Sequence, residues 1–171
     1  MREEDITDRY IAWAKDPELM ENLNAPARAI NRTQLRRYIK TFDNKTKFHL
    51  GVFSKESGVH IGFFTVFVDA KNRSAQTNVV IGDRDYWGKG VVLETRGAII
   101  DFLFDVIGVA KIWGTPFERN FPSIFNYKAQ GFTCEGVLRK HVVNVKGKRV
   151  DQYIFGLLRE EWHARQAKAS A

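Results

Sequence analysis

Cysteine is nearly absent from this chain, which has one such residue among 171. A single cysteine excludes an internal disulfide framework, and no Cys/His spacing resembles a zinc site, so no metal is expected. We expect Cys134 to be a small buried apolar residue, with a reactive thiol as the alternative. The fold must therefore rest on an apolar core, for which a chain of this length is sufficient.

Long apolar segments and a leader-like N-terminus are also missing. The chain opens with Met1-Arg2-Glu3-Glu4-Asp5, which is too acidic and polar for a signal peptide. The most apolar stretch, 98–110, carries Asp101 and Asp105, so we expect no segment that spans a bilayer. These absences favour a cytoplasmic protein with one domain over residues 1–162 and a loose polar tail over 163–171.

Positive charge predominates, with 27 Lys and Arg against 20 Asp and Glu, a net charge of +7. This excess suits nucleic acid, a membrane surface or a polyanionic small ligand. However, no run reaches five like charges, so solvated faces account for most of them. No motif combines basic and aromatic residues, which disfavours nucleic acid as the partner.

Hydrophobic periodicity predicts helices before and between strands. Helix-capping signals at Asp5, Asp16-Pro17 and Asn31 begin three helical stretches. Alternating residues then predict a meander of three antiparallel strands. The expected order is helices over 5–14, 16–23 and 31–42; strands over 48–52, 61–67 and 77–81; a helix over 91–106; a strand over 111–115; a helix over 120–129, closed by Gly131; and a hairpin over 132–158.

This order predicts a mixed α/β (α+β) fold rather than a doubly wound sheet or a barrel. We expect one mostly antiparallel sheet with helices on both faces.

The stretch from Gly82 to Gly90 leaves a strand and opens a helix. Its closing glycines, Gly88 and Gly90, let backbone N–H groups approach an anion, and the helix N-terminus adds its positive dipole end. A Walker A loop fails because Val91 follows Gly90, and a dinucleotide fingerprint fails because Leu93 stands at its third glycine. The pattern fits a pyrophosphate, or else a tight turn without a ligand.

A second polar pattern lies on the helix expected from Asn120. Asn120, Ser123 and Tyr127 stand at helical spacing on one face. The alternative is structural: Asn120 caps the helix, Ser123 is solvated and Tyr127 packs with its hydroxyl wet. A separate apolar stripe is expected to bury against the sheet; it comprises Phe121, Ile124, Phe125 and Ala129.

Together the two patterns resemble the GNAT superfamily of acetyltransferases, in particular the branch with ribosomal-protein alanine and spermidine N-acetyltransferases. The resemblance covers about residues 5–162. It rests on D-Y-W-G-K-G at 85–90 with Glu94, on N-x-x-S-x-x-x-Y-x-x-x-G-F from Asn120 to Phe132, and on G-L-L-R-E-E-W at 156–162.

The resemblance implies a sheet splayed centrally, between the strands 77–81 and 111–115, with acetyl-CoA in the splay. Asn120 and Tyr127 would be catalytic: Asn120 hydrogen-bonds the pantetheine or fixes the acetyl region, and Tyr127 is the general acid near the CoA sulfur. Backbone N–H groups at 79–81 are candidates to hold the oxyanion. The implied cofactor-binding residues are Val79, Val80, Ile81, Trp87, Gly88, Lys89, Gly90, Val91, Val92, Asn120, Ser123 and Tyr127.

The chain also departs from the family pattern in four ways. The strand over 76–81 carries no carboxylate to deprotonate an amine; His49, His60 and His141 are candidates, although each is more often a packed or surface histidine. Asp85 stands where many superfamily members carry Gln or Arg. Val91 and Val92 stand where smaller residues are often found. The usual first edge strand is also missing, so we expect an exposed edge covered in a homodimer.

The predicted function is transfer of an acetyl group from acetyl-CoA to a primary amine, on a small amine, an amino sugar or a protein N-terminus. The alternative is a binding module that keeps the fold and senses acetyl-CoA without turnover.

Overall fold

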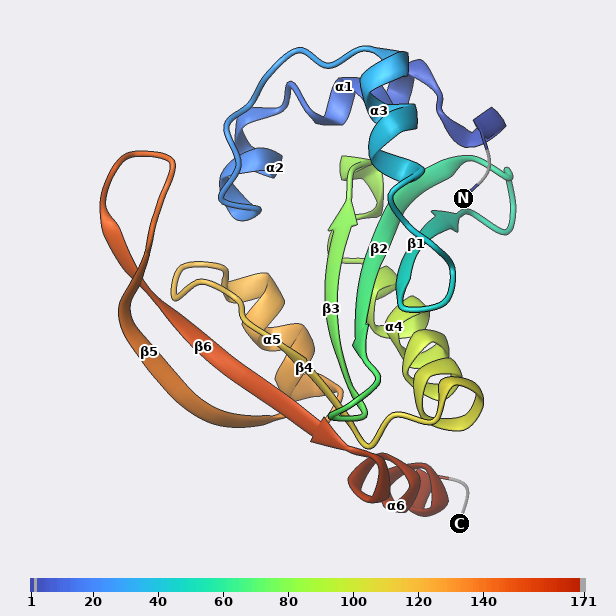
Figure 1. Ribbon diagram of the computed structural model, residues 1–171, viewed down its shortest axis with the longest axis vertical. Coiled ribbons are helices and arrows are strands. Elements are labelled where there is room, and N and C mark those ends of the chain that lie inside the picture. Colours follow the sequence, from blue (N-terminus) through green and yellow to red (C-terminus); the bar gives the residue numbers. More distant parts are fainter. Residues whose placement is uncertain (2, 170–171) are drawn as a thin grey trace.

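Figure 1 shows the computed structural model of the chain, which describes residues 1 and 3–169. One six-stranded sheet has the order β1-β2-β3-β4-β6-β5. All neighbouring strands are antiparallel except β3 and β4, so the mixed, mostly antiparallel sheet predicted from the sequence is confirmed. The strands are β1 Lys47–Phe53, β2 His60–Asp69, β3 Ser74–Ile81, β4 Lys111–Gly114, β5 Thr133–Val143 and β6 Arg149–Leu158.

Helices cover the sheet on both faces (Figure 1). Successive strand residues point to opposite faces, so Phe64 packs in one cluster with Ile100 of α4, while Phe63 packs in the other with Tyr10 and Trp13 of α1. The helices are α1 Asp8–Trp13, α2 Pro17–Asn22, α3 Arg32–Ile39, α4 Val91–Asp101, α5 Phe121–Ala129 and α6 Arg159–Ala169, with 3₁₀ turns Glu3–Asp5 and Arg84–Tyr86 and a π-helical segment Phe102–Ile107.

The centre of the sheet divides between β3 and β4. Their parallel pairing joins Ser74–Gln76 to Lys111–Trp113 and goes no further. β4 continues beside β6, while β3 continues beside β2 up to Ile81. The two halves of the sheet therefore diverge, and a gap opens from Thr77 onward.

The β5–β6 hairpin reaches from the second half of the sheet toward the N-terminal helices. Near the hairpin tip, Lys146 pairs with Glu21 of α2, and the Asn24 side-chain amide donates to the Val143 carbonyl at 2.9 Å. This contact joins segments more than a hundred residues apart, so the hairpin and α2 border the same space above the gap.

The structure corrects several expectations at element ends. Thr7, rather than Asp5, caps α1, because Asp5 lies in the preceding 3₁₀ turn. The helix after Gly90 changes from α to π at Phe102. The tail expected to be loose from His163 is helical to Ala169, anchored where the Trp162 indole donates to Asp101 at 2.7 Å.

Cys134, expected to be buried, is exposed, since it lies on β5 at the edge of the sheet. Across residues 1 and 3–169, no helix is long and apolar enough to cross a membrane. The same residues contain no group of three or more His, Cys, Asp and Glu arranged to hold a metal ion. The cytoplasmic location expected from the sequence stays a prediction.

Candidate functional site

A glycine turn begins α4 beside the wider end of the gap. Gly88 and Gly90 have φ of +73° and +76°, angles that side-chain-bearing residues rarely adopt. Gly90 is the N-cap of α4 and offers no side chain to its first turn. The Leu93 N–H donates to the Gly90 carbonyl at 3.0 Å, so the N–H groups of Val91 and Val92 remain available to an anion.

The strand β3 presents alternate backbone groups to the gap. The Gly82 N–H donates to Ile61 on β2 at 2.9 Å, so by antiparallel alternation Val80 also faces β2. Thr77 and Ile81 face the gap instead, since their carbonyls accept from the Tyr127 hydroxyl and the Trp87 indole. Val79 lies between them on the same side. Its N–H and C=O can therefore pair with an extended ligand, while Val80 contributes only its side chain.

Tyr127 of α5 lies at the closed end of the gap. Its side chain is buried, its ring stacks on Phe155 at 5.3 Å between centroids, and its hydroxyl donates to the Thr77 carbonyl at 3.3 Å. Gly114, the last residue of β4, leaves the space for this hydroxyl, because a Cβ there would lie 1.9 Å from it. A phenolic O–H is thus held where β3 and β4 separate.

The rest of α5 differs in part from the sequence prediction. Asn120 caps the helix by accepting from the Ser123 N–H at 3.1 Å, and both residues border the gap. The apolar stripe is predicted wrongly: Phe121 and Phe125 are 71% and 65% exposed. The helix turns Tyr127, with Ile124, toward the sheet because that side packs against Phe132 and Phe155, so Tyr127 belongs to the buried side rather than to a solvated ladder.

A cavity of about 450 Å³ follows the gap from the glycine turn to α5. Almost all the residues that the sequence assigns to cofactor binding line this cavity. Lys89 and Tyr127 do not border it; the Lys89 ammonium lies over the Tyr86 ring at 5.8 Å, and Tyr127 borders the adjoining cavity. The predicted residues that line it are Val79, Val80, Ile81, Trp87, Gly88, Gly90, Val91, Val92, Asn120 and Ser123.

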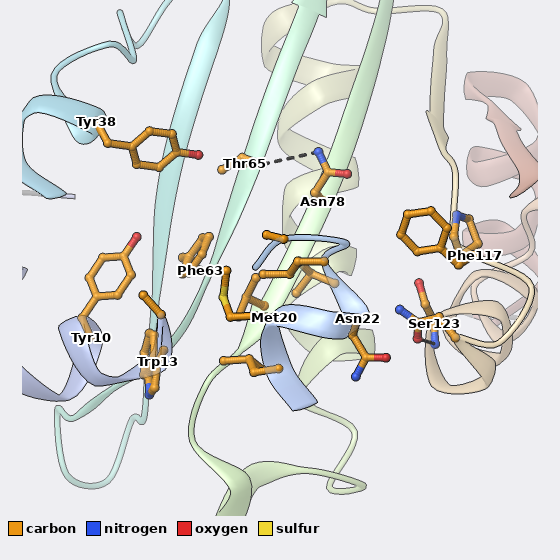
Figure 2. A pocket seen from close by; sticks show the side chains of 18 of the residues that line it. Tyr10, Trp13, Met20, Asn22, Tyr38, Phe63, Thr65, Asn78, Phe117 and Ser123 are labelled. Carbon is orange, nitrogen blue, oxygen red and sulfur yellow. Dashed lines mark hydrogen bonds between the residues drawn. The ribbon is translucent and has the colours of Figure 1, made fainter. Parts of the chain in front are cut away.

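A larger cavity of about 740 Å³ adjoins the first and is bounded by the N-terminal helices, the sheet and the β4–α5 loop. Figure 2 shows its polar floor, where the Asn78 amide donates to Thr65 Oγ1 at 3.4 Å while its oxygen points away toward Phe117. The size suits a small-molecule site. Its aromatic wall consists of Tyr10, Trp13, Tyr38, Phe63, Phe67 and Phe117.

The histidines considered as bases do not border either cavity in the described part of the chain. His49 and His60 are buried in the aromatic cluster beneath α1, and His141 is exposed on β5. Burial lowers the pKa of His49 to about 4 and also lowers the pKa of His60. His49 is hydrogen-bonded to one residue of the larger cavity's wall, Tyr10, whose hydroxyl lies 2.8 Å from its Nε2.

Sequence reasoning missed Arg96, a fully buried cation at the floor of the larger cavity. Its guanidinium lies 4.4 Å from the centre of the Tyr127 ring, and it donates to the Gln130 side chain at 3.4 Å. Among the described residues no carboxylate lies within ion-pairing distance of it, and burial lowers its pKa. The helical pattern of α4 gave no signal that an arginine would face inward.

Three comparisons place this architecture among known proteins. Residues 1–133 match the family described as acetyltransferase (GNAT) domain. The uncharacterized N-acetyltransferase p20 of Bacillus licheniformis is 33% identical over 56% of the chain and 52% of its own length, so the match spans about half of that protein. The SPbeta prophage-derived uncharacterized N-acetyltransferase YokL of Bacillus subtilis is 26% identical over 91% of the chain and 86% of its own length.

Solved structures agree on the fold. Spermidine N-acetyltransferase from Vibrio cholerae, crystallised with CoA and spermine, superposes with a TM-score of 0.82 at 16% identity, over 95% of this chain and 94% of that one. Ribosomal-protein-S5-alanine acetyltransferase from Vibrio fischeri superposes with a TM-score of 0.78 at 18% identity, over 95% and 92%. With the family matched over residues 1–133, the chain belongs to the GNAT family of acetyltransferases and is an acyltransferase.

Proposed function

We propose that the chain transfers an acetyl group from acetyl-CoA to a primary amine, carried by a small amine, an amino sugar or a protein N-terminus. One observation carries this proposal: the gap between β3 and β4 has a glycine turn that opens a helix at its wider end and a buried tyrosine hydroxyl at its closed end. A long ligand with phosphates at one end and a reactive sulfur at the other matches that layout.

The proposed placement of acetyl-CoA follows the free backbone groups. The pyrophosphate meets the first turn of α4, from Val91, with the glycine turn allowing close approach. The pantetheine arm lies along the gap and pairs with the Val79 carbonyl. The thioester then lies near Tyr127, where the smaller and larger cavities share Asn120 and Ser123 in their walls.

The proposed chemistry is direct attack of a neutral amine on the thioester carbon. A backbone N–H facing the gap, such as that of Val79, holds the developing oxyanion. The Tyr127 hydroxyl protonates or hydrogen-bonds the departing thiolate, after exchanging its long bond to Thr77 for one to the sulfur. Asn120 acts by fixing the start of α5.

The relatives leave the acceptor open. One neighbour is a spermidine enzyme crystallised with spermine, and another acts on a ribosomal protein. A non-catalytic acetyl-CoA sensor is the second candidate, favoured by the lack of a carboxylate on β3. Calorimetry with acetyl-CoA, followed by an assay of thiol release with a panel of amines, separates the two. Tight binding with amine-dependent thiol release supports the enzyme, and tight binding without release supports the sensor.

A further inference from the structure

The larger cavity has an unusual charge pattern for a site that takes amines. The charged and titratable residues that line it are Arg28, Arg96, Tyr10, Tyr38 and Tyr127. In the part of the chain that the structure describes, no Asp, Glu or His side chain belongs to its wall. Because both charged groups are positive, and one is fully buried, the cavity disfavours an ammonium ion and disfavours a polycation still more.

Nearby carboxylates are already engaged outside the cavity. Asp16, the N-cap of α2, and Glu18 within α2 both pair with Arg84, and Glu21 pairs with Lys146 of the hairpin. His49 lies behind the wall of the cavity, against Tyr10 and Phe63, and does not line it. The aromatic wall could favour a cation, yet the buried Arg96 already occupies the face of Tyr127, the aromatic ring closest to the proposed thioester.

The sheet floor offers a neutral acceptor in place of a carboxylate. Asn78 lies on β3 opposite Thr65 of β2, which lies opposite His49 of β1, so the three form one row. The Asn78 amide nitrogen donates to Thr65, and its oxygen points into the cavity (Figure 2). That oxygen can accept a hydrogen bond from an amine N–H without requiring the amine to be charged.

From these contacts we infer that the acceptor is a single, weakly basic amine on an apolar body, bound in its neutral form, rather than a polyamine. The inference rests on the proposed acetyl transfer. The aromatic wall packs against the apolar body, and the Asn78 oxygen positions the amine.

The reaction balances without a protein base when the amine enters neutral. The nitrogen forms a bond to the acetyl carbon as the carbon–sulfur bond breaks. The proton lost by nitrogen ends on the CoA sulfur, passed through Tyr127 or water, so the products are an amide and a thiol. A missing carboxylate on β3 is then no defect, because only an ammonium substrate would need one.

The test compares three acceptors: phenylalanine amide, 2-phenylethylamine and spermidine. An α-amino group has a pKa near ~8 and an alkylamine near ~10.4, so at pH 7.5 the first has about 10²-fold more neutral amine. We expect kcat/KM to follow that order, with spermidine the poorest, and to rise with pH toward each acceptor's own pKa. Calorimetry on the CoA-loaded protein should detect no saturable binding of spermidine.

A variant pair sharpens the comparison. Asn78→Asp places a carboxylate in the cavity and should raise kcat/KM for 2-phenylethylamine at pH 7.5 by about tenfold or more, with measurable binding of spermidine. Gln76→Glu adds the same charge to β3 outside the cavity and should change neither.

Two results would overturn the inference: spermidine binding more tightly to the wild-type protein than either monoamine, or one shared pKa below 7 in the profiles of both monoamines. In both cases amine-dependent thiol release from acetyl-CoA would show that the proposed acetyl transfer survives. Loss of acetyl-CoA binding by the wild-type protein would instead defeat the proposed function itself.

Discussion

The Tyr127 hydroxyl donates to the Thr77 carbonyl at 3.3 Å, at the first residue of β3 beyond its pairing with β4. This bond joins α5 to the point where the sheet divides. Because it is long for an O–H donor, it can be exchanged for a bond to a ligand atom at modest cost. The same contact places an acid where the proposed thioester ends.

Tyr127→Phe should lower kcat by roughly 10²-fold, a typical contribution of an acid–base group. The ring stays stacked on Phe155, so the affinity for acetyl-CoA should change little. The measurements are steady-state kinetics and calorimetry at pH 7. If Tyr127 were only structural, the Phe variant would turn over normally and Tyr127→Ala alone would be damaged, through loss of buried aromatic area.

Gly88→Val and Gly90→Val should each abolish acetyl-CoA binding measured by calorimetry. A Cβ at either site meets no atom within 4 Å, so the damage comes from the positive φ and from obstruction of the pyrophosphate rather than from a clash in the free protein. Gly97→Ala is the matched control, since it lies within α4, also in open space, without positive φ. It should keep binding and gain up to about 1 kcal/mol of stability. Binding within about threefold of wild type in both Val variants would remove the turn from the site.

Gly114→Ala should impair turnover without touching a ligand. Its Cβ would lie 1.9 Å from the Tyr127 hydroxyl and must displace that ring. We expect a fall in kcat that approaches that of Tyr127→Phe, together with a lower melting temperature. Gly136→Ala on β5 meets open space and is the control. Equal kcat for Gly114→Ala and the wild type would contradict the placement of Tyr127.

Acid should weaken the fold through His49. Burial lowers its folded pKa to about 4 from the ordinary 6.5, so the unfolded chain takes up the proton first as pH falls. The stability that the neutral imidazole contributes is complete above about pH 6.5 and is lost toward about pH 4, at most roughly 3 kcal/mol. His60 acts in the same direction, since its pKa is also lowered by burial.

Urea denaturation at several pH values tests this effect. His49→Gln, which keeps a partner for Tyr10 but does not titrate, should reduce the slope of unfolding free energy against pH between 6.5 and 4. His141→Gln, on the exposed side of β5, should leave the slope unchanged. An unchanged slope in His49→Gln would contradict a lowered pKa for His49 in the folded protein.

Much of the site was predictable because its signals are local. The glycine turn needs only two positive φ angles and a following helix, and the cap at Asn120 needs only its own first turn. The side of α5 that packs was not predictable, since Phe121 and Phe125 form one stripe while Ile124 and Tyr127 form another. Tertiary contacts with Phe155 decide between them.

Two features of the larger cavity could not be predicted because they depend on contacts between residues far apart in the sequence. The row through Asn78 and Thr65 depends on the β2–β3 register. The inward position of Arg96 depends on its contacts with Tyr127 of α5 and with Gln130, the C-cap of that helix.

The dimer expected from the exposed edge of β1 stays a prediction. Sedimentation across micromolar concentrations should detect self-association, and Phe53→Glu on that edge should weaken it; a stable monomer would count against it.

The most direct test of acetyl transfer is a stoichiometric one. The protein is incubated with acetyl-CoA and phenylalanine amide, and free thiol is counted against acetylated amide by mass spectrometry. We expect one thiol for each amide formed, with both dependent on the enzyme and slowed in Tyr127→Phe. Saturable acetyl-CoA binding with no amine-dependent thiol release, for this and every other amine tried, would contradict acetyl transfer and leave a sensor of acetyl-CoA.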